Sequence, residues 1–273
     1  MPSIDKINYL PKEEYWRAKS FLEKFSVYAL HWLASESQKE LKDQIIGNFI
    51  ARGMVCLDSI FRLWQAGNFQ DCWILHRTLI DRWVHLKHLA DHDEFEEFDK
   101  WTLQRRFKEM DVALSDPEIT EKLAPEVLEE QKILHKEMRM RIKREVPSTW
   151  SRPRAEDVAK QSNFLISYRL GYNPASSLVH PMSDDGKDDF ARLLGYKTEF
   201  NDDIPIVLHN SLPFLVLLIQ TGLNSSNLKW RKFVFDFYEQ IISNLESGTN
   251  DYILTYNKAF AYGPDFPWCT PNE

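Results

Sequence analysis

Apolar residues recur along most of the chain at the three- and four-residue spacing of an amphipathic α-helix, and strand-like alternation is hard to find. This pattern predicts an all-α fold. The predicted helices cover residues 11–35, 37–66, 69–91, 93–113, 125–145, 154–171, 174–180, 203–223 and 226–246, with a short restart at 115–118.

Local start and stop signals support these boundaries. The sequence "SQKE" (37–40) has capping-box form, and Ser115 is the expected cap before Pro117. The segment 147–154 reads as a loop, and the chain holds no internal repeat or low-complexity linker. We therefore expect a single-domain multi-helix bundle over residues 1–246. The Pro-rich segment 247–273 is expected to be an irregular tail that packs on its surface.

Composition narrows the class of protein without identifying its activity. Apolar residues make up 43% of the chain and charged residues 27%, as expected of a folded globular protein. The net charge of −7 argues against a large nonspecific nucleic-acid surface. Three cysteines without a CxxC pair (Cys56, Cys72 and Cys269) fit a reducing compartment. The most apolar run, 204–223, is interrupted by polar residues, so we expect a buried core helix, a cytoplasmic protein and no membrane partner.

The helix predicted over 69–91 carries a polar stripe. Successive residues turn by about 100° around a helix, so five polar side chains of this helix fall within a sector of roughly 80°. They are Arg77, Asp81, His85, His88 and His92. One interpretation is a solvated face with an i, i+4 ion pair between Arg77 and Asp81. The other is the wall of a groove, in which His85 and His88 are weak candidates for metal ligands. No HExxH sequence supplies further ligands, so no cofactor is expected.

A second polar stretch is "NPASSLVHPMSDDGKDDF" (173–190). Asn173 is a predicted N-cap with Pro174 in the first turn, giving a short helix over 174–180. Ser177 and His180 then share one face, where a hydroxyl and an imidazole can bind each other or an anion. A Ser–His nucleophile is not favoured, because the sequence has no GxSxG elbow. The four aspartates that follow lack calcium-loop spacing and indicate a solvated loop.

Two blocks, "HRTLIDRWVHLKHLADHDEFEEFDKW" and "YRLGYNPASSLVHPMS", resemble those of a bacterial family of uncharacterised helical proteins. The resemblance covers about 70–200. It matches Arg77 and Asp81 to an Arg-x-x-x-acid pair, and Tyr172, Ser176 or Ser177, and His180 to a later Tyr…Ser…His-Pro block. That family is loosely similar to HEPN-type helical domains, many of which are RNA-cleaving toxins or defence effectors. Arg82 and His88 have the Arg-x(4–6)-His spacing of those domains, although one such match is expected by chance.

These observations leave three hypotheses open, and with them the question of whether the protein is an enzyme. If the 69–91 helix packs on the 174–180 segment, Arg77, Asp81, Ser177 and His180 form one polar cluster. Such a cluster suits a phosphate-directed defence or toxin effector, RNase-like or nucleotide-sensing, with RNA or a nucleotide as ligand. The second hypothesis is a noncatalytic helical interaction module, acting as a homodimer through its abundant aromatic residues. The third is a metal-binding helical enzyme that uses His85 and His88.

Overall fold

The computed structural model describes residues 12–36, 40–179, 186–196 and 206–227, with positions 243, 244, 247 and 249. Every regular element in this part of the chain is a helix, which confirms the all-α prediction. The helices are α1 (Lys12–Glu36), α2 (Leu41–Gln65), α3 (Phe69–His92), α4 (Phe95–Ser115), α5 (Pro117–Thr120), α6 (Pro125–Arg144), α7 (Ala155–Gln161), α8 (Leu165–Ser177), α9 (Lys187–Leu193) and α10 (Ile206–Ser225).

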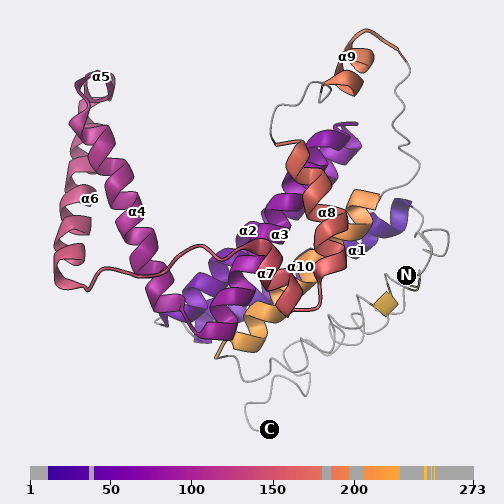
Figure 1. Ribbon diagram of the computed structural model, residues 1–273, viewed down its shortest axis with the longest axis horizontal. Helices are drawn as coiled ribbons and strands as arrows, with labels where there is room; N and C mark the ends of the chain where they lie inside the picture. Colours follow the sequence, from indigo (N-terminus) through magenta and orange to yellow (C-terminus); the bar gives the residue numbers. More distant parts are fainter. Residues whose placement is uncertain are drawn as a thin grey trace. The chain divides into compact units, whose positions relative to one another are not determined.

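The chain divides into two compact units. Unit 1 comprises residues 1–90 and 153–273, and unit 2 comprises residues 91–152. Helices α1, α2, α7, α8, α9 and α10 belong to unit 1 together with nearly all of α3, whereas α4, α5 and α6 form unit 2 (Figure 1). Residues 37–39, most of the helix predicted over 226–246, and most of the predicted tail lie outside the described residues.

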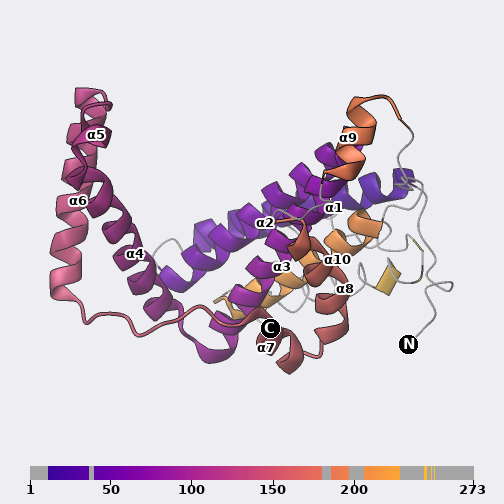
Figure 2. The same ribbon diagram turned by 45° about the horizontal axis from the view of Figure 1, so that its top comes forward.

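The core of unit 1 is built around α10. This helix packs on α1 and α2, which also pack on each other (Figure 2). A Cβ atom on Gly53 of α2 would lie 2.3 Å from Leu218 Cδ2, so only glycine allows this approach of α2 to α10. By length and composition α10 could cross a membrane, yet two-thirds of its most apolar window (67%) is buried inside unit 1. The expected buried core helix is thereby confirmed.

Two of the predicted helix boundaries around the second polar stretch are wrong. The helix expected over 154–171 is broken after α7, where Asn163 adopts the left-handed conformation (φ 59°) that asparagine tolerates. Conversely, no new helix begins at Asn173, because α8 runs without interruption through Asn173 and Pro174. A proline inside a helix removes its own N–H bond and crowds the carbonyl four residues earlier, yet α8 continues through Pro174.

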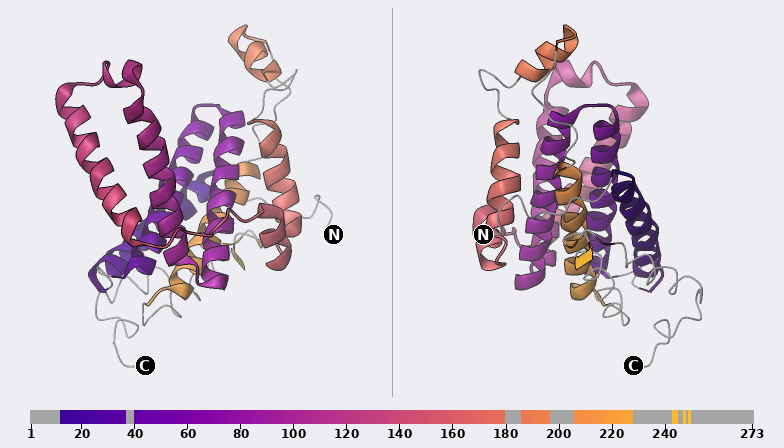
Figure 3. Two further views of the ribbon diagram at one scale, coloured as in Figure 1. Left: turned by 60° about the vertical axis from the view of Figure 1, so that its left-hand side comes forward. Right: turned by 90° about the vertical axis from the view of Figure 1, so that its right-hand side faces the viewer.

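Unit 2 is an antiparallel hairpin in which α6 packs along α4 and the short α5 lies at the turn (Figure 3). Asp116, not Ser115 as expected, caps α5: its Oδ1 accepts the Glu118 N–H at 2.9 Å, while Ser115 ends α4. His135 of α6 makes two contacts with α4. Its Nε2 lies 3.0 Å from Asp111 Oδ1, and its ring stacks on Phe107 with the ring centroids 4.6 Å apart.

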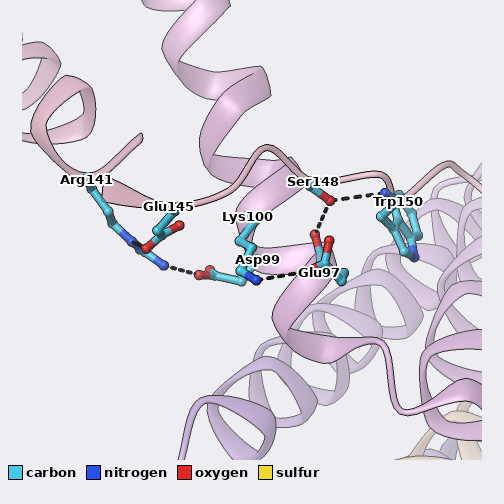
Figure 4. Close-up of polar contacts among 7 residues, drawn as sticks. All are labelled: Glu97, Asp99, Lys100, Arg141, Glu145, Ser148 and Trp150. Atoms are coloured by element: carbon cyan, nitrogen blue, oxygen red, sulfur yellow. Dashed lines mark hydrogen bonds and ion pairs between the residues drawn. The ribbon is translucent and has the colours of Figure 1, made fainter. Parts of the chain in front are cut away.

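The open end of the hairpin is closed by polar and aromatic contacts (Figure 4). Arg141 of α6 pairs with both Asp99 of α4 and Glu145. The Ser148 hydroxyl donates to the Glu97 carbonyl at 2.8 Å, which fastens the segment after α6 to the start of α4. Trp150 packs edge-on against Phe98 and Trp101, with ring centroids at 5.0 and 4.9 Å. The hairpin is therefore held together by contacts within unit 2.

Candidate functional site

Helices α3 and α8 of unit 1 approach closely at one glycine. A Cβ atom on Gly171 would lie 2.9 Å from His76 Nε2 and 3.3 Å from Ile80 Cδ1. Glycine at this position lets the backbone of α8 reach the surface of α3. Helices α3 and α8 therefore pack together just before the second polar stretch, and we call this α3–α8 contact the seam. The predicted cluster of Arg77, Asp81, Ser177 and His180 stays a prediction.

One turn from this glycine contact, three polar side chains meet. The Arg77 guanidinium donates from Nη2 to the Tyr172 hydroxyl at 3.2 Å, and its carbon lies 4.9 Å from the centre of the Tyr172 ring. The charge of the Asp81 carboxylate, one turn after Arg77 on α3, also acts on the Tyr172 hydroxyl and raises its pKa. Tyr168, one turn earlier in α8, stacks on Tyr172 with ring centroids 4.6 Å apart.

This arrangement differs from the expected i, i+4 ion pair on α3. The Tyr172 hydroxyl accepts from the Arg77 cation, and the charges of both Arg77 and Asp81 act on it. Burial of the phenol raises the pKa of Tyr172, and the Asp81 charge raises it further against the opposing effect of Arg77. Tyr172 is therefore neutral at physiological pH, and its hydroxyl supports the Arg77 guanidinium.

Most of the hydrogen-bonding capacity of Arg77 has no partner among the described residues. Of the five N–H donors of a guanidinium, only one is engaged by a described residue, and the Arg77 Nε is buried without a partner there. The Ser176 hydroxyl, one turn after Tyr172 in α8, is likewise buried with no partner in the described part of the chain. A buried donor or acceptor without a partner costs about 1–3 kcal/mol, so both atoms mark places where a ligand oxygen would be favourable.

Three other residues were predicted in or near the site, namely Ser177, His180 and Arg82. Ser177 is the last residue of α8 and is exposed, so Ser176, the alternative match, is the serine whose hydroxyl is buried. His180 lies outside the described residues, and its place in the cluster stays a prediction. Burial lowers the pKa of Arg82, the arginine of the HEPN-type spacing, and the nearby charges that act on it include Cys56 and Arg52 of α2.

The histidine stripe is only partly solvated. His85 and His88 are half-buried on α3, whereas His92 at its end is exposed. Nowhere in the described ranges do three His, Cys, Asp or Glu side chains come together as a metal would require. Because a zinc site needs at least three protein ligands, His85 and His88 do not form a metal centre with the residues described.

Sequence reasoning overlooked His76, the most buried polar group of the seam. His76 is fully buried, its Nδ1 lies 2.9 Å from the Ser211 hydroxyl, and its ring contacts Trp73 and Phe214 edge-on. Burial lowers the pKa of His76 to about 3, so the ring is neutral. The signal was present in the sequence, because His76 falls at helical spacing with the apolar positions 79, 80 and 83 rather than with the polar stripe.

Comparison with known proteins gives a family and no activity. A family described as "Family of unknown function (DUF5677)" matches residues 43–192, and the chain belongs to this family. The match covers α3, α8 and the whole of unit 2. No curated protein and no solved structure matches the chain.

Proposed function

We propose that this DUF5677 protein is a cytoplasmic, phosphate-directed helical effector that receives a phosphate group of a nucleotide or RNA at the α3–α8 seam. The observation that supports the proposal is Arg77. Its guanidinium is fixed on the Tyr172 ring and hydroxyl, and the other N–H donors have no partner among the residues described. A fixed guanidinium suits a phosphate because its planar fork binds two oxygens at once.

The neighbouring groups are suited to the same ligand. The Asp81 carboxylate lies close enough for its charge to act on the Tyr172 hydroxyl, the group that supports Arg77. The Ser176 hydroxyl adds a neutral group that can donate to a phosphate oxygen. None of these contacts reads a base, so the proposal concerns phosphate recognition and leaves base selectivity to other parts of the chain.

The RNase-like form of the proposal needs an acid–base group as well. His180 is the candidate, because an imidazole titrates near neutral pH and follows α8 by three residues. The loose HEPN-type resemblance motivates this form. A nucleotide-sensing form needs Arg77 but no catalytic histidine, so the two forms are separable by mutation.

Calorimetric titration with inorganic phosphate, a nucleoside triphosphate and a short RNA tests the binding step. We expect Arg77→Gln to weaken binding of phosphate ligands at least tenfold, since a charge-assisted hydrogen bond is worth about 1.5–3 kcal/mol. Arg169→Gln is the matched control, because Arg169 also lies on the α8 side of unit 1 but is exposed and paired with Glu156 at 3.3 Å. Equal affinities for wild type and Arg77→Gln would refute the proposal.

Growth arrest on expression and cleavage of labelled RNA separate the two forms. In the RNase-like form, His180→Ala abolishes both cleavage and arrest while it leaves phosphate binding in place. In the nucleotide-sensing form, His180→Ala behaves as wild type and Arg77→Gln alone loses the effect. A wild-type protein that binds none of the three ligands would exclude both.

A further inference from the structure

Unit 2 carries an apolar surface that the hairpin does not cover. Helix α6 has no buried residue over its whole length, and α4 has one, Phe95. Between α4, α5 and α6 lies an open groove of about 540 Å³, whose apolar lining includes Met110, Leu114, Ile119, Val127, Leu134 and Met138. We call this surface the hairpin groove.

The groove lining is exposed to an unusual degree for side chains of this type. Ile119, Val127 and Leu134 each keep 41% of their surface accessible. Two helices share one interface, so a hairpin can bury one apolar stripe per helix and needs further helices to cover a wider one. An exposed apolar groove with a charged surround is typical of an interaction site.

The distribution of charge along the hairpin indicates what covers the groove. Residues 109–131, which form its tip, carry eight acidic side chains and one basic side chain. Residues 95–108 and 132–145, which form its open end, together carry ten basic and five acidic side chains. The hairpin is therefore negative at the tip and positive toward the open end.

A hairpin with an acidic tip and a basic open end is complementary in charge to a second copy that lies antiparallel to it. In a twofold dimer both copies use the same surface, so a contact from tip to open end occurs twice. An antiparallel arrangement of the two hairpins therefore places each acidic tip on the partner's basic open end. A parallel arrangement would place the two acidic tips together, which is unfavourable. The apolar lining of both grooves would then form the centre of a four-helix bundle.

We infer that the hairpin groove binds the same groove of a second copy of this chain, with the two hairpins antiparallel. The inference concerns unit 2 alone and does not depend on the phosphate ligand proposed for the seam. Accordingly, Arg77→Gln is expected to leave the dimer unchanged.

Sedimentation of the full chain across a range of concentrations tests the inference. We expect a species with twice the 32.3 kDa mass of the chain. Val127→Glu places a charge in the groove and should raise the dimer dissociation constant on the order of 30-fold, the effect of losing one well-packed central contact. Val112→Glu is the matched control, because Val112 lies on α4 outside the groove lining and is 70% exposed.

Orientation is tested by reversing charge at the tip with Glu126→Lys, Glu129→Lys and Glu130→Lys together. These residues are exposed, so the variant is expected to fold, which circular dichroism checks. An antiparallel dimer is weakened by the change and by added salt, whereas a parallel dimer is strengthened by both. A monomeric wild type, equal effects of the two Val→Glu variants, or a tighter dimer after charge reversal would each overturn the inference.

Discussion

Lowering the pH should destabilise unit 1 through His76. The Ser211 hydroxyl donates to the Val207 carbonyl at 2.6 Å, so its oxygen accepts from His76 and the ring proton resides on Nδ1. His76 Nε2 is then a bare nitrogen, buried against Gly171 with no partner in the described residues. A second proton would have to enter this site as a buried charge without an acceptor.

The size of the effect follows from the difference between the folded and unfolded pKa values of His76. Burial lowers the folded pKa to about 3 from an ordinary value of 6.5. Because the unfolded state takes up the proton first, the free energy of unfolding decreases as the pH falls below 6.5. Between about pH 7.5 and about pH 5 the loss is about 2 kcal/mol, with a limiting slope of about 1.4 kcal/mol per pH unit.

Urea denaturation followed by tryptophan fluorescence measures this loss, since Trp73 contacts His76 directly. The informative comparison is with His76→Asn, whose side-chain amide can still donate to Ser211 but cannot titrate. His209 also has a pKa lowered by burial, and it titrates equally in both proteins, so its contribution cancels. The variant should be less stable at neutral pH yet lose about 2 kcal/mol less on acidification. Parallel pH profiles for the two proteins would show that His76 is not a buried neutral base.

Four further substitutions, at three positions, test packing and buried polar contacts in unit 1 by urea denaturation. Gly171→Ala should lower the free energy of unfolding by about 1–3 kcal/mol, because its Cβ would lie 2.9 Å from His76 Nε2. At Gly47 on α2 an added Cβ would meet only Leu30 Cδ2, at an ordinary contact distance of 4.0 Å, so Gly47→Ala should stabilise by about 0.5–1 kcal/mol. Equal effects of the two Gly→Ala changes would contradict the close approach of α3 and α8. Asp43→Ala removes the buried carboxylate that accepts from the Asn227 backbone at 3.2 Å and from its amide at 3.1 Å, so we expect a loss of about 1–2 kcal/mol. Asp43→Asn should lose less, and no change in either variant would refute a stabilising role.

The helices themselves were largely predictable, because their apolar spacing is regular over two or more turns. The boundaries that failed depend on single residues with more than one permitted conformation. Asn163 can continue a helix or adopt a positive φ, and Pro174 can begin a helix or interrupt one, according to the tertiary contacts nearby. Asp116 and Ser115 are both acceptable caps, and only the backbone of the finished turn decides between them.

The seam was predictable as a meeting of two segments, but its pairing was not. Helical spacing places Arg77 beside Asp81 on one stripe, and it cannot show that a tyrosine from α8 accepts from Arg77. That choice depends on the axial offset of α8 against α3, which the close approach at Gly171 fixes. The prediction therefore identified Arg77 and Asp81 and gave Tyr172 no role of its own.

The hairpin groove illustrates a different limit. The groove is lined from α6 by three apolar residues, Val127, Leu134 and Met138, and by the uncharged Gln131. These positions repeat at helical spacing whether the chain itself or another molecule covers them. The prediction of a helix over 125–145 was compatible with both. What separates the two cases is the order of charges along the hairpin. A hairpin that only needs to be soluble can mix its charges, whereas segregation into an acidic tip and a basic open end costs self-repulsion within each end. A second hairpin in the antiparallel orientation removes that cost at both ends, which is why charge order, and not hydrophobicity, carries the inference about the partner.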